Sequence, residues 1–214
     1  MIKTVIFDMD GTVLDTLSDL AGAINHELSR YHMPQRTENE VRSFVGNGIR
    51  VALKLAATEG TTDEMLDDMV ADFRTYYDAH CLDNTKPYAG ITELMKSLSE
   101  KGCKLGIVSN KIDSAVKELS DRFFKEYVTV AIGEKPGINR KPAPDTVTHA
   151  MKELGSSKEE TVYVGDSEVD VLTAKNTGIP CISVLWGFRD KDFLKENGAT
   201  TFADAPSEIL DLIK

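Results

Sequence analysis

The stretch from Val5 to Thr16 reads VIFDMDGTVLDT, and its character changes within a few residues. Three apolar residues, Val5 to Phe7, are typical of a buried strand, and two aspartates and a glycine follow them. Residues two apart on a strand share a face, so Asp8 and Asp10 can point into one cleft. Gly11 then lets the backbone turn away and leaves room for a ligand. The stretch therefore predicts a strand that delivers two carboxylates to one place.

Further along the chain, short apolar runs rich in β-branched residues alternate with helical patterns. The strand-like runs are TVIF at 4–7, KLGIVS at 104–109, YVTVAI at 127–132, TVYVG at 161–165 and CISVLW at 181–186. They lack alternating polar residues, as strands covered on both faces do. Helical patterns lie between them at 91–102, 114–123 and 145–155. We therefore predict right-handed βαβ units and an α/β fold with a Rossmann-like parallel sheet.

The region between the first and second predicted strands is unusually long. It contains helical patterns and no strand pattern, and a βαβ crossover needs far fewer residues. We interpret residues 16–83 as an all-α cap inserted into a core domain made of residues 1–15 and 84–214. A series of acidic side chains in the cap is expected to face solvent: Asp63, Glu64, Asp67, Asp68 and Asp72.

Composition excludes several classes of function. The formal net charge of -10 argues against nucleic-acid and anionic-membrane partners, because both require clustered positive charge. The three cysteines form no CxxC pair, so neither a disulfide framework nor a zinc site is indicated. The N-terminal residues lack a signal-type apolar region, so we expect a cytoplasmic protein. An acidic protein can still bind an anion where a lysine, backbone amides or a metal reverse the local field.

Polar side chains also follow the later predicted strands. Ser109 and Asn110 follow the second strand, where we expect a hydroxyl and a backbone amide at the start of a helix. Lys141 stands in RKPAPD, a loop that two prolines keep extended, and GDSEVD supplies Asp166 and Asp170. Ligands of parallel α/β sheets bind outside the carboxyl ends of the strands, so we expect these residues to meet there.

The chemistry of this set is coherent. Several carboxylates at one place repel each other unless a hard cation binds, and oxygen ligands suit Mg²⁺. Lys141 and Ser109 can donate to a phosphoryl group. Asp8 can then attack phosphorus, while Asp10 protonates the leaving oxygen and later deprotonates water. Each motif alone is explained by a turn, a helix cap or a rigid loop, but their joint occurrence in this order favours a site.

These motifs resemble those of the haloacid dehalogenase-like hydrolase superfamily. DMDGT, Ser109, Lys141 and GDSEVD match its four motifs, and the resemblance extends to WGFRD at 186–190. It implies that Asp8 is the phosphorylated nucleophile and Asp10 the general acid/base. The residues implied to bind Mg²⁺ are Asp8, Asp10 through its carbonyl, and Asp166, with support from Asp170. The residues implied to hold the phosphoryl group or substrate are Ser109, Lys141, Asn110, Gly11 and Thr12.

The inserted helices resemble the cap of this superfamily, which closes over the site and excludes water. FVGNGIRVAL at 44–53, with PYAGI at 87–91 and WGFRD, is similar to phosphoglycolate phosphatases and their close relatives. In the cap, VGNG offers exposed amides to a small carboxylate, and a nearby arginine adds charge. The candidate substrate-binding residues there are Gly46, Asn47, Gly48 and Arg50. A simple helix–helix turn explains the glycines equally well.

The resemblance implies a Mg²⁺-dependent phosphatase for a small phosphorylated metabolite, acting through an aspartyl-phosphate, with phosphoglycolate as the first choice of substrate. Pyrophosphate, sugar phosphates and nucleotides stay open. A β-phosphoglucomutase-type phosphomutase is disfavoured, because its cap histidine aligns with Leu20. Asp10 argues against a dehalogenase or a phosphonate hydrolase, so Lys54 is interpreted as an exposed helix residue. A non-catalytic protein would be expected to lack at least one site residue. We expect a monomer or a homodimer.

Overall fold

The computed structural model describes residues 1–214, and the chain forms two compact units. The core comprises Met1–Leu14 and Pro87–Lys214, and the cap comprises Asp15–Lys86. These boundaries lie a few residues from the expected ones. The chain passes between the units through β2 (Leu14–Asp15) and β3 (Lys86–Pro87), which pair as a two-stranded sheet.

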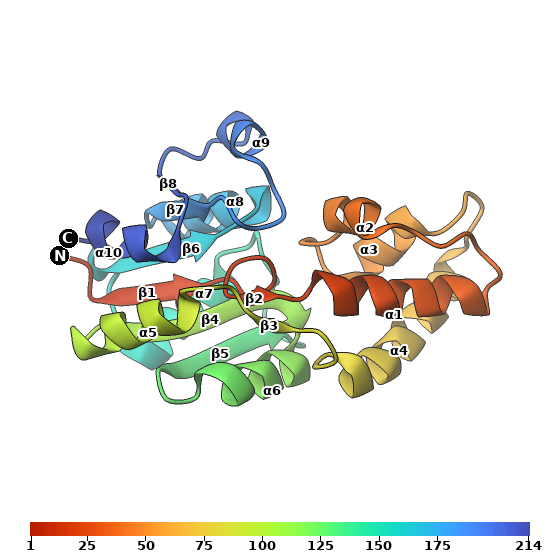
Figure 1. The fold of residues 1–214 in the computed structure, drawn as a ribbon, viewed down its shortest axis with the longest axis horizontal. Coiled ribbons are helices and arrows are strands. Elements are labelled where there is room, and N and C mark those ends of the chain that lie inside the picture. The colour runs from red at the N-terminus through yellow and green to blue at the C-terminus, as the bar shows by residue number, and fades with distance from the viewer. The chain divides into compact units, whose positions relative to one another are not determined.

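The core is built on a six-stranded parallel sheet with the order β5-β4-β1-β6-β7-β8 (Figure 1). Its strands are β1 (Thr4–Phe7), β4 (Lys104–Ile112), β5 (Val128–Glu134), β6 (Thr161–Gly165), β7 (Cys181–Val184) and β8 (Phe202–Ala203). The side chains of β1 and β6 are buried throughout, because both strands lie inside the sheet and helices cover its two faces. The carboxyl ends of β1, β4 and β6 are therefore adjacent.

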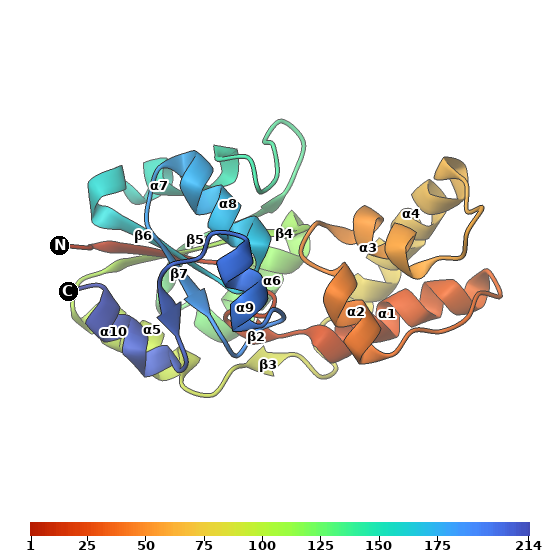
Figure 2. The same ribbon diagram turned by 90° about the horizontal axis from the view of Figure 1, so that it is seen from above.

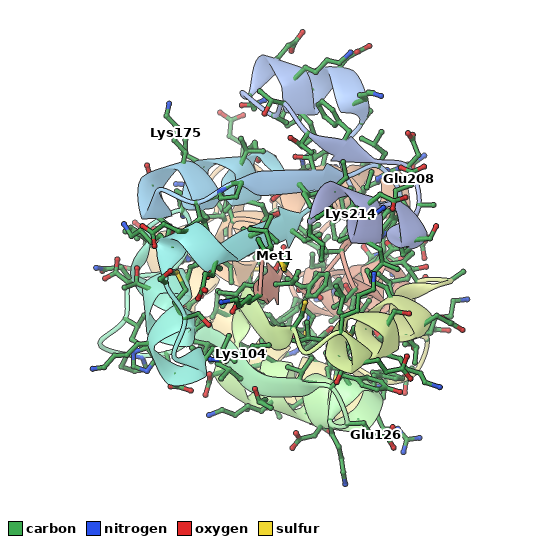
Figure 3. The ribbon with its side chains drawn as sticks, turned by 90° about the vertical axis from the view of Figure 1, so that its left-hand side faces the viewer. Met1, Lys104, Glu126, Lys175, Glu208 and Lys214 are labelled. Carbon is green, nitrogen blue, oxygen red and sulfur yellow. The ribbon has the colours of Figure 1, made fainter.

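Helices cover both faces of this sheet, as the view along the strands shows (Figure 3). One face carries α7 (Asp145–Leu154) and α8 (Glu168–Thr177), and the other carries α5 (Ile91–Glu100), α6 (Asp113–Phe124) and α10 (Ile209–Leu212). The remaining core elements are η1 (Lys158–Glu160), α9 (Lys191–Glu196) and η2 (Pro206–Glu208). Both chain termini lie at one end of the core (Figure 2). No helix is both long enough and apolar enough to cross a membrane.

One sequence expectation about the second strand is wrong. β4 does not end at Ser109 but continues to Ile112, and α6 begins only at Asp113. Ser109 and Asn110 consequently lie within the strand, and neither is at a helix N-terminus. The late elements β8 and α10 lack a strong pattern because they are only two and four residues long.

The cap consists of four helices: α1 (Leu17–Arg30), α2 (Glu38–Phe44), α3 (Ile49–Ala56) and α4 (Asp63–His80). Apolar residues of α1 and α4 are buried, as amphipathic helices that pack on one another require. The acidic residues of α4 are mostly exposed, although Asp72 is half-buried and pairs with Arg30. The cap is thus the all-α insertion that the sequence indicates.

Asp19, near the start of α1, is a buried carboxylate that holds the segment leading out of the cap. Its oxygens accept hydrogen bonds from the backbone and side chain of Asn84 at 2.8–3.1 Å. They also accept from the backbone and hydroxyl of Thr85 at 2.9 and 2.8 Å. Burial acts to raise the pKa of Asp19, but these hydrogen bonds outweigh it and lower the pKa.

Replacing Asp19 with alanine is expected to lower the free energy of unfolding by about 2–3 kcal/mol at pH 7, because donors of Asn84 and Thr85 lose a charged acceptor. A carboxylate with a lowered folded-state pKa stabilises the fold above its unfolded pKa, and this stabilisation is lost as the pH falls through the folded pKa. The difference between the proteins should therefore shrink below about pH 4. Urea denaturation across pH measures it, with exposed Asp78→Ala as the control. A constant difference would contradict this explanation.

Candidate active site

The turn after β1 is held in a narrow conformation. The carbonyl of Met9 accepts hydrogen bonds from the backbone of Thr12, Val13 and Leu14 at 3.0–3.3 Å. Gly11 has φ +80°, a left-handed conformation that favours glycine, and a Cβ there would lie 2.3 Å from Asp166 Oδ2. The glycine thus allows the turn to pack directly against the aspartate that follows β6.

Three buried carboxylates gather at the carboxyl ends of β1 and β6. One oxygen from each of Asp8, Asp166 and Asp170 lies within 4.8 Å of the others. The Asp8 carboxylate also accepts a hydrogen bond from Met9 N at 2.7 Å, which fixes its orientation at the end of β1. The structure therefore brings Asp8 of the first motif together with Asp166 and Asp170 of the last, as the sequence predicts.

Lys141 joins two of these carboxylates. Its Nζ lies 2.9 Å from Asp8 Oδ1, 2.7 Å from Asp170 Oδ1 and 3.0 Å from the Tyr163 hydroxyl, and its side chain is 2% exposed. Burial acts to lower the pKa of Lys141, but Asp170 and Asp8 outweigh it and raise the pKa well above its ordinary value. The side chain is therefore a fixed, buried ammonium in contact with Asp8.

Asp170 is mainly an anchor for its neighbours. Its Oδ2 accepts hydrogen bonds from the backbone of Asp166 and Ser167 at 3.2 and 3.1 Å, and from the Ser167 hydroxyl at 2.6 Å. Its Oδ1 is occupied by Lys141 and by Tyr163, whose hydroxyl donates at 3.2 Å. Asp170 therefore caps the start of α8 and orients Lys141, which is more than the supporting role expected for it.

Two carboxylates of the site have raised pKa values. Burial, followed by the nearby charge of Asp170, raises the pKa of Asp8 well above its ordinary value, although Lys141 acts against this. The same two causes raise the pKa of Asp166 to about 7, while a hydrogen bond from Phe188 N opposes them. Negative charge is thus costly here until a positive group binds.

Asp10 has a partner that the sequence interpretation missed. The Nζ of Lys111 lies 2.9 Å from Asp10 Oδ1, and the lysine side chain is 4% exposed. Lys111 follows Ser109 and Asn110 directly, but in a single sequence it is indistinguishable from a surface lysine at the end of a strand. The site therefore contains two buried lysines, each paired with an aspartate of the DMDGT motif.

Ser109 and Asn110 are both buried beside this site. The Ser109 hydroxyl accepts a hydrogen bond from Lys111 N at 3.2 Å. The Asn110 side chain donates to the carbonyl of Lys141 at 3.0 Å and thereby supports the loop that carries Lys141. The Asn110 side chain thus orients a site residue, while its expected contact with substrate stays a prediction.

The WGFRD segment after β7 supports the first and last motifs. Phe188 N donates to Asp166 Oδ2 at 2.7 Å, and the Trp186 indole donates to the carbonyl of Thr12 at 3.0 Å. A Cβ on Gly187 would lie 2.3 Å from the Asp166 Cβ, so only glycine allows the backbone to pass this close to Asp166. The Thr12 hydroxyl also donates to Asp166, at 3.3 Å. Resemblance alone pointed to this segment, and neither these contacts nor the role of Tyr163 was predicted.

The candidate substrate residues of the cap lie around the turn between α2 and α3. Gly46 and Gly48 have φ of +114° and +82°, so the turn requires glycine at both positions. Arg50, which was expected to add positive charge for a substrate, already pairs with Asp63 at 2.8 Å and with Asp67, both on α4. Its charge is thus balanced within the cap.

Comparison with known proteins agrees with this geometry. The model of the haloacid dehalogenase-like hydrolase family matches residues 5–184, which include Asp8, Asp10, Ser109, Lys141, Asp166 and Asp170. The chain belongs to this family. The predicted family and the predicted α/β fold with a helical cap are both confirmed.

Curated relatives in this hydrolase family cover the whole chain. The chain is 30% identical over 213 residues to pyrophosphatase PpaX of Halalkalibacterium halodurans, covering 99% of this chain and 97% of the relative. It is 30% identical over 219 residues to phosphoglycolate phosphatase 1 of Pseudomonas aeruginosa, covering 99% of this chain and 77% of the relative. These matches confirm the prediction of an enzyme of the phosphatase type.

A solved structure shows the same fold over both units. The crystal structure of a presumed phosphoglycolate phosphatase from Lactobacillus delbrueckii subsp. bulgaricus aligns with a TM-score of 0.93 at 37% identity, covering 99% of this chain and 98% of that one. A protein from Haemophilus somnus, described as a predicted phosphoglycolate phosphatase, aligns with a TM-score of 0.90 at 24% identity, which supports the fold.

Proposed function

We propose that this protein is a cytoplasmic, Mg²⁺-dependent phosphatase that hydrolyses a small phosphate monoester through an aspartyl-phosphate on Asp8, with 2-phosphoglycolate as the preferred substrate. The observation that carries the proposal is the contact of Lys141 Nζ with Asp8 Oδ1 at 2.9 Å, with Asp10 two residues along the same strand end. This arrangement offers a fixed carboxylate nucleophile, a cation for phosphoryl oxygens and a second carboxylate for proton transfer.

In the first step, an Asp8 oxygen forms a bond to phosphorus while the bond to the leaving oxygen breaks, and Asp10 gives its proton to that oxygen. In the second step, Asp10 takes a proton from water, which attacks phosphorus and releases phosphate from Asp8. Lys141 keeps the attacking carboxylate in place and offers positive charge to the phosphoryl oxygens. The buried position of Asp8 limits its access to bulk water.

The carboxylate cluster fits a magnesium ion. Asp8, Asp166 and Asp170 supply only oxygen ligands, and burial raises the pKa of Asp8 and of Asp166, so a cation would relieve a real electrostatic cost. Asp8 and Asp166 would hold the ion, together with the Asp10 carbonyl, whereas the oxygens of Asp170 are already occupied by Lys141 and α8. When bound, the ion would neutralise charge on the phosphoryl group.

The choice among substrates rests on the relatives. Phosphoglycolate phosphatase is the name of several curated relatives, and pyrophosphate is the second candidate because of the two PpaX proteins. A phosphomutase is disfavoured by Leu20, an apolar side chain buried in α1 of the cap that cannot exchange protons.

The test is phosphate release from 2-phosphoglycolate, pyrophosphate, sugar phosphates and nucleoside monophosphates at equal concentrations. We expect turnover with Mg²⁺ and clear preference for 2-phosphoglycolate. Preference for pyrophosphate would select the second candidate. If the folded protein released phosphate from none of them, the proposed function would be wrong.

Magnesium removal gives an independent prediction. Excess chelator should abolish turnover, and added Mg²⁺ should raise the melting temperature of the native protein, because the ion binds only the folded cluster. Replacing Asp166 with asparagine should remove most of this thermal shift, whereas Asp78→Asn on the exposed face of α4 should leave it unchanged. An equal shift in both variants would show that Mg²⁺ binds elsewhere.

A further inference from the structure

β4 carries an irregularity immediately next to the site. Val108 pairs with Ile132 of β5, and Ile112 pairs with Glu134. Between these two pairs β4 advances four residues, whereas β5 advances two. The extra residues fall at 109–111, between the two pairs. Bulges of this kind occur next to active sites, where they change the direction of a side chain. Here the bulge ends with Lys111.

Gly133 of β5 lies against the bulge and leaves room for its backbone. A Cβ on Gly133 would lie 2.5 Å from Asp113 Cα and 2.6 Å from the carbonyl oxygen of Lys111, so only glycine fits. Gly133 N also donates to Asp113 Oδ1 at 2.9 Å, which ties β5 to the residues just after the bulge. Gly133 of β5 thus packs closely against the backbone of the bulge at Lys111.

This backbone places a buried ammonium on Asp10. Lys111 Nζ lies 2.9 Å from Asp10 Oδ1, and both side chains are largely buried, at 4% and 19% exposure. Burying a lysine is costly unless its charge is balanced, so a lysine in this position is not explained by packing alone. Lys141 contacts Asp8, so Lys111 is a second cation of the site, and it contacts a different aspartate.

We propose that Lys111 is a specificity-determining residue that pairs with a second anionic group on the leaving part of the substrate. The inference rests on the proposed function, in which Asp10 faces the leaving oxygen. A cation bonded to Asp10 then borders the leaving group, and an anion one or two bonds beyond the leaving oxygen lies within its reach. Substrates with a carboxylate or a second phosphate near the scissile bond are favoured over esters with neutral leaving groups.

The charge balance of the site agrees with this preference. Four aspartates, Asp8, Asp10, Asp166 and Asp170, lie beside two buried lysines, Lys111 and Lys141. Removing the positive charge of Lys111 makes this set of groups more negative, which disfavours a multiply charged substrate. Lys111 adds positive charge beside Asp10.

The test compares 2-phosphoglycolate with 2-phosphoglycolamide, which has the same leaving oxygen but an uncharged carboxamide. Lys111→Met should lower kcat/KM for the acid about 30-fold more than for the amide, and Lys111→Arg should restore part of the difference. If the substitution only changes the orientation of Asp10, kcat/KM falls by the same factor for both compounds, and the ratio of the two kcat/KM values is unchanged. Lys96→Met, on the exposed face of α5, is the control.

Binding gives the second readout. Titration calorimetry of the Asp8→Asn protein with Mg²⁺ measures the Kd of 2-phosphoglycolate and of 2-phosphoglycolamide. Replacing Lys111 with methionine in this protein should weaken binding of the acid more than binding of the amide, by the same factor as in the kinetic experiment. An unchanged ratio in both experiments, with wild-type turnover intact, would overturn the role of Lys111 and leave the proposed function standing. If the wild type showed no turnover but the binding ratio changed, the role of Lys111 would stand and the proposed function would be wrong. Failure of both compounds to bind would overturn the role of Lys111 as well.

Discussion

Asp8→Asn is expected to reduce kcat by about 1,000-fold or more with every phosphate ester that the wild type hydrolyses, because the side chain can no longer form the bond to phosphorus. The substitution preserves shape and the acceptor for Met9 N. Phosphate release measured with Mg²⁺ at saturating substrate tests it directly. Incubation with substrate followed by intact-mass measurement should show a phosphorylated wild type after rapid quenching, and no such species in the variant.

The fold of this variant should survive. Burial and Asp170 raise the pKa of Asp8, so an uncharged amide at this position removes a charge that the folded protein tolerates poorly in metal-free buffer. We expect a melting temperature equal to or above that of the wild type without Mg²⁺. Residual turnover of more than a few per cent in a folded Asp8→Asn protein would refute the assignment of the nucleophile.

Lys141→Met is expected to lower the free energy of unfolding by about 3–5 kcal/mol in metal-free buffer at pH 7, because it leaves buried Asp8 and Asp170 without their shared cation. Turnover should fall at least about 100-fold, since the ammonium that holds the attacking carboxylate is lost. Urea denaturation and phosphate release measure the two effects. Lys125→Met, an exposed change on the surface of the core, should alter neither.

The destabilisation should depend on pH in a defined direction. Asp8 has a folded-state pKa above its unfolded value, so the neutral acid is tolerated at low pH, and stability is lost as the pH rises through the folded pKa. Without Lys141, the charge that opposes this rise in pKa is lost, so the loss of stability relative to wild type should be larger at pH 8 than at pH 5. Lys141→Arg, which keeps the charge, should retain more stability than Lys141→Met. A loss that is equal at both pH values would contradict the buried ion pairs as its cause.

Much of the core site was predictable because its residues stand beside strong local patterns. Asp8 follows an apolar run that can only be an inner strand, and Asp166 follows a second run of this kind. The loop of Lys141 was recognisable from its prolines. These features place each residue at the carboxyl end of a strand, and parallel pairing then brings the ends together.

The roles of individual side chains were less predictable. Substrate binding by Asn110 and Arg50 stays a prediction, but the contacts of Asn110 with the Lys141 loop and of Arg50 with two carboxylates of α4 were not predicted. Tyr163 resembles an ordinary core residue until its hydroxyl is seen between Lys141 and Asp170. In each case the partner lies far along the chain, where no local pattern identifies it.

By itself, the sequence determined the parallel sheet, the helical insertion and the position of Asp8 and Asp10 at a strand end, because burial on both faces and tight turns impose patterns on neighbouring residues. Only the tertiary structure decided that Lys141 joins Asp8 while Lys111 joins Asp10. The direction of Lys111 depends on the register between β4 and β5 and on the space left by Gly133. Register is a property of paired strands, so it exists only once they have come together.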